Sequence, residues 1–558
     1  MNFLLAQEPI DMPAPFGFDT WLTFWMCIAI ATINAIAMCF AGYRFLQVLQ
    51  LSGYKIKGYF AYIKDTKGKT WGGLIMLSVL SSAALLMTNV LLSDFFYFKI
   101  MTYLGLVFYL IFLIMYLVNM YALPAKIPLR YTRRMTRLMT VMAVLVFVIT
   151  FIMTGFSEVN IPYFRYGSVA LIPALLPLII VLAHYITMPF EVLNNKRFVK
   201  NSTKKLNKKT NLIKIGITGS YGKTTVKNIL GTILSEKYKV CTSPHSFNTP
   251  MGISKTVLNN LKDDHEVFIA EMGARHVGDI FELCDIVHPS IGILTGIGNQ
   301  HLSTFGSQEN LQKTKAELAV AVKDSGGKMY FSGDSKGSKE IYENFDGNKE
   351  IISVDSTEGK VFVSDISVDD KGSKFTLHIG EKSAKCNTTL LGKHNISNIL
   401  LCCAVCADLG LSINEIKAGI SKLVPTAHRL ALIPSQNSLI VIDDAYNANV
   451  AGSKAALEVL KLFEGKKYVI TPGLVELGSE AFNANFQFGI DMAKVCDKVI
   501  IDGALNFEAL QAGLIFGGME KENILRAATL RQATEVLQRF ATPGDVVLFE
   551  NDLPDNYT

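Results

Sequence analysis

Five long apolar stretches dominate the first 190 residues of this 558-residue chain. Each is almost free of charge and long enough to cross a bilayer as a helix. Five such runs would overfill the core of a soluble helical bundle, so the pattern predicts membrane spans. The expected spans cover residues 21–41, 71–92, 100–120, 138–155 and 169–188.

Beyond residue 210 the pattern changes to short apolar runs that alternate with helical periodicity. The run 213–218 is typical of a buried strand, and 226–234 has apolar residues every three or four positions, as a helix does. Further strands are expected at 267–270 and 291–295. Because strands alternate with helices, we expect a multi-domain chain with an α-helical membrane region followed by an α/β part.

Basic residues alternate between the loops that join the expected spans. The loop after the first span, the loop before the fourth and the segment after the fifth are rich in Lys and Arg, whereas the leader and the other two connections are not. Because positive loops stay in the cytoplasm, we expect a multi-pass protein of the cell (inner or plasma) membrane, with the N-terminus outside and everything after about residue 190 inside. The leader has no basic segment before its apolar stretch, which argues against a cleaved signal peptide.

The net charge of +6 comes mostly from these loops. The basic run 196–209 is expected to touch the anionic headgroups of membrane lipids. It shows neither the aromatic interleaving nor the fold of a nucleic-acid-binding surface, so nucleic acid is not an expected partner.

Nine cysteines are scattered along the chain without paired Cys-x-x-Cys motifs. Cys402, Cys403 and Cys406 lie in an apolar helical stretch, where small buried thiols are expected rather than a metal site. A cytoplasmic location predicts that these thiols are reduced.

A glycine-rich turn joins the strand 213–218 to the helix that follows it. Its residues are Gly219, Ser220, Tyr221, Gly222, Lys223, Thr224 and Thr225. Glycines let backbone N–H groups approach phosphate oxygens, and the helix N-terminus adds positive potential. Lys223 can reach the terminal phosphates of a nucleotide, and Thr224 can ligate Mg²⁺. Only two residues separate the glycines where the usual P-loop has four, so an ordinary turn with a surface lysine is the alternative.

Two polar side chains follow the next expected strands. Glu271 comes directly after 267–270, and a carboxylate at the tip of a parallel strand near the phosphate loop is well placed to hold Mg²⁺. His301 lies in the loop after 291–295 and would face the same crevice. Taken alone, each has a simpler explanation, as a solvated strand-end glutamate and a structural histidine.

Together with later motifs, these residues resemble the Mur ligase family, and within it the MurF-like members that add D-alanyl-D-alanine. The family's loop is Gly-x-x-Gly-Lys-Thr-Thr/Ser, which accounts for the short glycine spacing. Seven motifs match in the right order, which makes chance an inadequate explanation. The matching segments are residues 219–225, 248–252, 271–274, 301–307, 392–398, 442–449 and 475–478.

The resemblance implies a division of the chain into four parts. They are a transmembrane region at 1–190, a basic juxtamembrane linker at 191–210, an α/β P-loop Mur ligase ATP-binding middle domain at 211–425 and a Rossmann-like α/β C-terminal domain at 426–558.

The resemblance also implies ATP and Mg²⁺ as cofactors, with two metal sites. Thr224 and Glu271 would hold one Mg²⁺, and His301 with a carbamylated Lys315 would lie near the second. Lys223 and the loop 219–225 would cradle the phosphates, so that Lys223, Glu271, His301 and Lys315 form the expected catalytic set. For Lys315 an unmodified lysine on a surface helix is the alternative.

Other matching residues would bind the remainder of the nucleotide or the substrates. Those expected at the nucleotide are Asn395, Asn398, Arg429 and Asp444, and those expected near the substrates are Asn248, Tyr446, Asn447 and Asn449. Because the nucleotide would then lie between the middle and C-terminal domains, we expect hinge closure near residues 424–429.

The chain departs from the family pattern in two places. Five apolar stretches stand where the family's uridine-nucleotide-binding domain is expected. The Lys-Gly-Ser-Arg signature of the MurF-like members is missing at the C-terminus, where 546–549 leads into Glu550. The ATP machinery is retained while the substrate-gripping regions are changed, so the identity of the substrates does not carry over.

The expected activity is that of an ADP-forming acid–amino-acid ligase. A carboxylate would attack the γ-phosphate of ATP, and an amino acid or short peptide would displace phosphate from the acyl phosphate to give an amide. Membrane tethering favours a lipid-linked carboxylate acceptor, an envelope precursor of peptidoglycan biosynthesis.

Two other functions stay open at this point. One is a polyamino-acid synthetase similar to poly-γ-glutamate ligases, which product length would distinguish. The other is a membrane sensor or transporter whose ATP site only regulates. Few polar residues interrupt the spans, chiefly Asn34, Asn89 and His184, which disfavours a transport path.

Overall fold

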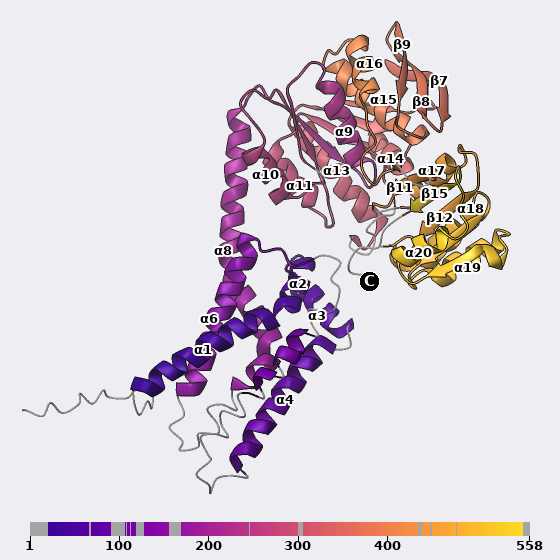
Figure 1. The fold of residues 1–558 in the computed structure, drawn as a ribbon. Helices are drawn as coiled ribbons and strands as arrows, with labels where there is room; N and C mark the ends of the chain where they lie inside the picture. Colours follow the sequence, from indigo (N-terminus) through magenta and orange to yellow (C-terminus); the bar gives the residue numbers. More distant parts are fainter. Residues whose placement is uncertain are drawn as a thin grey trace, which may run out of the picture. The chain divides into compact units, whose positions relative to one another are not determined.

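The fold is described from a computed structural model, drawn as a ribbon in Figure 1. The chain forms two compact units, Met1–Asn194 and Asn195–Thr558. The expected site residues His301 and Asn447 lie outside the described residues. The described residues are 21–65, 69–90, 107, 109–111, 113–118, 128–155, 169–244, 246–298, 305–433, 438–446, 449–475 and 477–550.

The regular elements in the described part of the first unit are all helices (Figure 1). Its main helices are α1 (Trp21–Ala41), α2 (Tyr43–Leu51), α3 (Ile56–Asp65), α4 (Lys69–Val90), α6 (Arg133–Gly155) and the first part of α8 (Ile172–Lys208). Several polar side chains inside it are hydrogen-bonded to one another, which a low-dielectric interior favours. The amide of Asn34 on α1 donates to Oγ1 of Thr150 on α6 at 3.0 Å and accepts from the hydroxyl of Tyr109 at 3.1 Å.

Three helices in the described part of the chain are long and apolar enough to cross a membrane. They are α1 over Phe24–Ala41, α6 and α8, which correspond to the first, fourth and fifth expected spans. The second and third expected spans contain shorter apolar helices, Trp71–Ala83 and Tyr109–Val118. Parts of both lie outside the described residues, so the structure supports three membrane-length helices where the sequence predicted five.

The segment 191–210 was expected as a basic linker. Its residues are helical as far as Lys208 and form the second half of α8. Its last turns pack on the second unit, to which they belong. Lys205 donates through Nζ to the carbonyls of Val257 and Leu261 at 2.9 and 2.6 Å, and the hydroxyl of Ser202 donates to that of Ser254 at 2.9 Å.

The middle domain is built on a six-stranded parallel sheet with helices on both faces (Figure 1). The strand order is β2 (Val240–Thr242), β3 (Val267–Glu271), β1 (Ile213–Thr218), β4 (Ile291–Leu294), β5 (Lys328–Ser332) and β6 (Lys349–Ile352). Its helices are α9 (Lys223–Leu234), α10 (Pro250–Asn259), α11 (Asp279–Val287), α13 (Gln308–Asp324) and α14 (Lys336–Asn344). Because β3 and β4 flank β1, the carboxyl ends of all three strands meet at one edge, where open α/β sheets bind ligands.

A small antiparallel sheet and two helices complete the middle domain. They are β7 (Val361–Asp369), β8 (Gly372–Ile379), β9 (Lys382–Thr388), α15 (Lys393–Asp408) and α16 (Ile413–Ser421). Helix α15 packs on α9, and Cys402, Cys403 and Cys406 are buried free thiols of the surrounding core, as the sequence predicted. Burial raises the pKa of each thiol well above its ordinary value, so they are inert packing groups.

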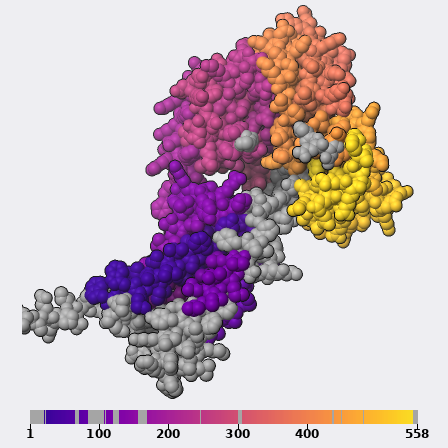
Figure 2. All heavy atoms as spheres, in the orientation of Figure 1, coloured from indigo at the N-terminus to yellow at the C-terminus, as the bar shows by residue number. Residues whose placement is uncertain are grey.

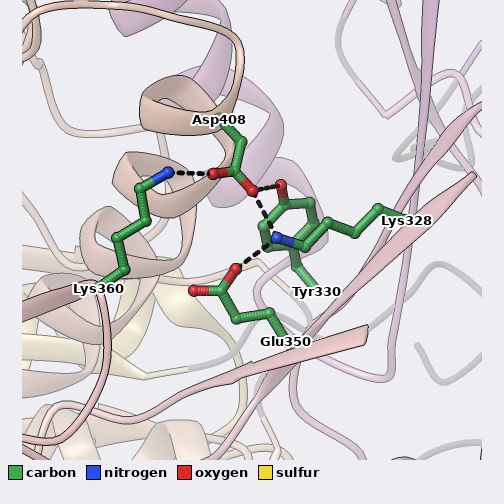
Figure 3. A network of polar contacts seen from close by, with 5 residues as sticks. All are labelled: Lys328, Tyr330, Glu350, Lys360 and Asp408. Carbon is green, nitrogen blue, oxygen red and sulfur yellow. Dashed lines mark hydrogen bonds and ion pairs between the residues drawn. The ribbon is translucent and has the colours of Figure 1, made fainter. Parts of the chain in front are cut away.

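An ionic cluster fixes the C-terminal end of α15, as Figure 3 shows. Asp408 accepts from the ammonium groups of Lys328 and Lys360 at 2.5 and 2.6 Å and from the hydroxyl of Tyr330 at 2.6 Å. Glu350 also binds Lys328, at 2.6 Å. Burial alone would raise the pKa of Asp408, but these donors outweigh it and hold the pKa at about 2. The cluster joins α15 to β5, to β6 and to the segment before β7.

The C-terminal domain has a second six-stranded sheet and appears as the orange-to-yellow lobe in Figure 2. The strand order is β10 (Ala431–Ile433), β11 (Ile440–Asp444), β15 (Val546–Glu550), β12 (Lys467–Thr471), β13 (Lys498–Asp502) and β14 (Ile524–Ala527). Only β10 is antiparallel. The helices and 3₁₀ turns of this domain are α17 (Val450–Leu460), η1 (Gly478–Glu480), α18 (Ala481–Ala493), α19 (Phe507–Phe516), η2 (Lys521–Asn523) and α20 (Leu530–Leu537).

Candidate active site

The loop after β1 has two positions where a side chain would not fit. Gly219 has φ +152° and Gly222 has φ +83°, conformations that L side chains rarely adopt. A Cβ on Gly219 would lie 2.0 Å from Oγ1 of Thr295, and one on Gly222 would lie 3.3 Å from Oδ1 of Asn398. The backbone of the loop therefore packs closely against Thr295 and Asn398. Because no side chain projects from the two glycines, the N-terminus of α9 stays open to a ligand.

The same loop is fastened to the end of β4. The N–H of Ser220 donates to the carbonyl of Gly296 at 2.8 Å, and the hydroxyl of Thr295 donates to the carbonyl of Tyr221 at 2.5 Å. These bonds fix the loop before any ligand binds, so that little ordering is needed on binding.

Lys223 begins α9 and reaches back over the loop. Its Nζ donates to the carbonyls of Gly219 and Ser220 at 2.7 and 3.0 Å. Burial lowers the pKa of this ammonium to about 8; the carboxylate of Glu271 opposes that shift and Arg429 adds to it. The side chain is held at the mouth of the loop, where a terminal phosphate would meet it.

Glu271 closes β3 and is buried beside this loop. The amide of Asn248 donates to its Oε1 at 3.1 Å, and Nζ of Lys227 lies 3.4 Å from its Oε2. The side chains of Glu271 and Lys227 are each only 1% exposed. A solvated strand-end glutamate, the alternative considered for Glu271, is therefore wrong.

Sequence reasoning missed Lys227. A signal for it was present, because Lys227 lies one helical turn after Lys223 and so shares its face of α9. What the sequence did not show was the burial of that face against β3.

Lys315 lies on α13 and is 3% exposed, so the surface-lysine alternative is also wrong. Burial and the nearby charge of Lys223 lower its pKa well below the ordinary value, although Asp279 and Glu317 oppose the shift. The carboxylate of Glu317 also binds the start of α11, where it accepts hydrogen bonds from the N–H groups of Gly278 and Phe281 at 2.7 and 2.9 Å. A neutral amine at Lys315 is the form that reacts with CO₂.

A cavity of about 360 Å³ opens beside the phosphate loop and lies between the middle and C-terminal domains. Eight of the residues expected at the site line it. They are Gly222, Thr225, Asn395, Asn398, Arg429, Asp444, Tyr446 and Asn449. Residues that are more than 200 positions apart in sequence thus face one space.

The C-terminal side of the cavity is held by its own contacts. The guanidinium of Arg429 lies over the ring of Tyr446, 4.9 Å from its centroid. The N–H of Leu430 donates to Oδ1 of Asp444 at 3.1 Å, and Leu430 has φ +48°, so the chain turns sharply there. Asn449 caps α17 by accepting the N–H groups that follow it, which makes its role structural as well as cavity-lining.

Glu550 is a second residue that sequence reasoning did not assign. It pairs directly with Asp444 in the parallel register of β11 and β15, and it is fully buried. Its carboxyl lies within hydrogen-bonding reach of the Asp444 carboxyl and has no other partner among the described residues. Burial raises the pKa of Asp444 to about 7, and burial together with the charge of Asp444 raises the pKa of Glu550 well above its ordinary value.

The cluster fits a nucleotide polyphosphate with a divalent cation. The glycine cradle, the lysine and the helix N-terminus suit phosphate groups, and the adjoining cavity offers amides and an arginine for the rest of the molecule. Within the described residues, no three His, Cys, Asp or Glu side chains gather as a protein-only metal site. The Thr224 hydroxyl and the Glu271 carboxylate are oxygen donors, the kind of ligand that suits a Mg²⁺ sharing its remaining positions between phosphate oxygens and water.

Family models match most of the second unit. The Mur ligase middle domain matches residues 217–406, and the Mur ligase glutamate ligase domain matches residues 428–550. A UDP-N-acetylmuramoyl-tripeptide–D-alanyl-D-alanine ligase of Mycobacterium bovis is 30% identical over 358 residues, which are 60% of this chain and 69% of that protein. The corresponding ligase of Bacillus subtilis is 29% identical over 347 residues, with 60% and 72% covered.

Solved structures agree with the sequence matches. MurF from Acinetobacter baumannii has a TM-score of 0.58 and 25% identity, covering 65% of this chain and 78% of that one. MurF from Thermotoga maritima in complex with ADP shares the fold, with a TM-score of 0.57, 23% identity and 64% and 80% covered. The chain therefore belongs to the Mur ligase family, whose members are ATP-dependent, ADP-forming ligases that use Mg²⁺.

Proposed function

We propose that this chain is a membrane-anchored ligase that joins an amino acid or short peptide to the carboxylate of an envelope precursor. The observation that carries the proposal is the cluster of Lys223, Glu271 and Lys315 beside the cavity between the two domains. Relatives are named for a UDP-N-acetylmuramoyl-tripeptide and D-alanyl-D-alanine, which suggests a related acceptor and amine here.

The proposed reaction has two steps. The carboxylate oxygen of the acceptor attacks the γ-phosphorus of ATP, and ADP leaves with the electron pair of the broken bond. The amine then attacks the acyl carbon, phosphate leaves, and the ammonium proton that the amine loses passes to solvent. Charge builds on the phosphoryl group in the first step, so fixed cations and N–H groups are the main source of rate.

Each named residue has a place in this scheme. Lys223 and the loop 219–225 hold the β- and γ-phosphates, while Thr224 and Glu271 hold one Mg²⁺. Lys315, once carbamylated, carries an anionic oxygen suited to a second Mg²⁺, for which His301 is the other expected contact. Asn395, Asn398, Arg429 and Asp444 hold the nucleoside end of ATP.

Substrate-side roles are proposed for four further residues. Asn248 contacts Glu271, and Tyr446 and Asn449 line the cavity; Asn447, which lies outside the described residues, is the fourth. A neutral Lys315 amine supports carbamylation, because a lone pair on nitrogen is needed to bond to the carbon of CO₂.

The proposed location is the cell membrane, with five spans, the N-terminus outside and the ligase domains in the cytoplasm. Three membrane-length helices and two shorter apolar ones support it. An enzyme held there is suited to a lipid-linked acceptor at the inner leaflet, which would make a soluble nucleotide-sugar domain dispensable.

The test is ATP-dependent phosphate release by the detergent-purified chain, with products identified by mass spectrometry. Acceptors should include a soluble UDP-sugar peptide and its lipid-linked counterpart, each with a panel of amino acids and dipeptides. We expect release only with a lipid-linked carboxylate and an amine, and addition of one unit. Full activity on the soluble acceptor would contradict the lipid-linked acceptor, and long products would instead indicate a polyamino-acid synthetase.

A matched pair of variants controls this assay. Lys223→Ala should abolish phosphate release, whereas Lys313→Ala, an exposed lysine on α13 paired with Glu309, should leave it unchanged. A wild-type chain that releases no phosphate with any acceptor and amine would contradict ligase activity itself.

A further inference from the structure

A second cavity, of about 500 Å³, lies in the first unit between the start of α6 and the middle of α8. We call it the α6–α8 cavity. Its polar lining includes Arg133 and Arg137 at the N-terminus of α6, and its apolar lining includes Val141 and Phe190. All of its lining residues belong to the first unit, whereas the cavity beside the phosphate loop is lined by residues of the second.

Arg137 is held in place by a buried acid. Its Nε and one terminal nitrogen both bind Oε1 of Glu191 at 2.7 Å, and the Glu191 side chain is 7% exposed while that of Arg137 is 47% exposed. An arginine has five N–H donors, so this fixed guanidinium keeps donors for a ligand. The pair fixes the orientation of the cation without closing the cavity.

The charge of the cavity suits a single anion. Arg133 and Arg137 together outweigh Glu191 by one positive charge, and no ion pair joins Arg133 to an acid in the part of the chain that the structure describes. The N-terminus of the 23-residue helix α6 adds partial positive charge at the same end. A monoanionic phosphodiester matches this balance, whereas a pyrophosphate would need more cations.

Two exposed apolar stripes run from this cationic end. On α6 the stripe begins at Val141 and continues toward the C-terminus of the helix. On α8 it begins at Phe190 and continues toward the N-terminus of the helix, at every fourth residue. The exposed residues are Val144, Val148 and Ile152 on α6, and Ile186, Leu182 and Leu178 on α8. From Val141 to Ile152 the helix rises about 16 Å, close to half of the roughly 30 Å hydrocarbon core of a bilayer.

We propose that the α6–α8 cavity binds the phosphate of an anionic glycerophospholipid of the inner leaflet, with its acyl chains along the two apolar stripes. The proposal rests on the membrane location given above, because the basic end of α6 then lies at the cytoplasmic headgroups. One net positive charge at that depth, followed by one leaflet of apolar surface, matches such a lipid in both charge and length.

The test is native mass spectrometry of the full chain in a neutral detergent, titrated with phosphatidylglycerol, phosphatidylcholine, polyprenyl phosphate or glycerol 3-phosphate. We expect one tightly bound phosphatidylglycerol per chain. Arg133→Gln/Arg137→Gln should weaken it on the order of tenfold or more, because two charge-assisted hydrogen bonds are lost. Val141→Trp should weaken it as well, because it fills the cavity without changing charge.

The matched control removes two cations outside the cavity. Lys313→Gln/Lys336→Gln, two exposed lysines on α13 and α14 of the second unit, should bind phosphatidylglycerol as the wild type does. An equal loss in this control, unchanged binding in the double arginine variant, or equal binding of phosphatidylcholine would overturn the proposal. Preference for polyprenyl phosphate or for free glycerol 3-phosphate would also overturn it, by assigning the cavity to a lipid carrier or to a soluble phosphate.

Failure of the proposed membrane location or of the proposed ligase activity would appear in experiments other than the lipid titration. A chain recovered in the soluble fraction without detergent would contradict the membrane location, and absent phosphate release would contradict the ligase. Neither result depends on the lipid titration, which measures only the binding of lipid to the chain.

Discussion

Asp444 and Glu550 lie directly opposite each other at the carboxyl ends of two paired parallel strands. Two carboxyl groups so placed in a buried setting cannot both ionise readily, so the pair holds a proton at neutral pH. Burial raises the pKa of Asp444 to about 7 and that of Glu550 well above its ordinary value. A carboxyl whose pKa is raised by folding stabilises the fold below its unfolded pKa, and that stability is lost as pH rises through the folded pKa.

Glu550→Gln should therefore reduce the loss of stability between pH 5 and pH 8. Glutamine keeps the size and neutrality of the protonated acid but has no proton to lose. The difference between the wild type and the variant should grow with pH and reach on the order of 1 kcal/mol. Urea unfolding at several pH values measures it, and Glu458→Gln, an exposed acid on α17, should follow the wild type. Parallel pH profiles for the wild type and Glu550→Gln would count against the shared proton.

ATP affinity should weaken above pH 8 because of Lys223. Its pKa in the free protein is about 8, so at pH 9 most of the amine is neutral and must gain a proton when phosphates bind. Well above that pKa, the dissociation constant should rise about tenfold per pH unit. Calorimetry in buffers of different ionisation enthalpy should show proton uptake at pH 9 and little at pH 6.5. Uptake that does not change with pH would contradict the assignment.

Lys227→Met should destabilise the middle domain strongly. The substitution leaves Glu271 buried without its cation, and breaking a buried pair from one side costs about 3 kcal/mol. The double variant Lys227→Met/Glu271→Gln should be more stable than the sum of the two single changes predicts, because no unpaired charge remains. Denaturant unfolding of all four proteins measures the coupling, and simple additivity would show that the pair does not interact.

Removal of CO₂ should lower activity reversibly through Lys315. Its neutral amine bonds to the carbon of CO₂ and releases a proton, and CO₂-free buffer reverses that reaction. We expect bicarbonate to restore phosphate release in the wild type, while Lys315→Ala stays at least about 100-fold less active under both conditions. Lys313→Ala should behave as the wild type does. Activity that is indifferent to CO₂ would leave Lys315 as an unmodified lysine.

Much of the nucleotide side of the site was predictable from sequence. The strand, loop and helix around Gly219–Lys223 follow from local periodicity, and Glu271 lies at a strand end because the apolar run stops there. Lys227 and Glu550 were not predictable in the same way. Their roles depend on which strand lies beside which, and only the sheet order brings Lys227 to Glu271 and Glu550 to Asp444.

The membrane half was harder to predict in detail. Hydropathy identifies apolar runs, and three of them form described helices that are long and apolar enough to cross a membrane, while parts of the other two runs lie outside the described residues. The segment 191–210 was predicted as a basic juxtamembrane linker, and its residues up to Lys208 continue the turns of α8. Lys and Arg have good helix propensity, so a basic stretch after a span can extend the same helix.

The cluster around Asp408 has a consequence for how the cavity between the two ligase domains changes width. Helix α15 has 16 residues and is about 24 Å long; Asp408 is clamped at one end, and Asn395 and Asn398 lie near the other. The cavity wall that carries the two asparagines is thus anchored within the middle domain. We expect any closure on a nucleotide to change the distance from this wall to Arg429 and Asp444 and to leave the form of the wall itself unchanged.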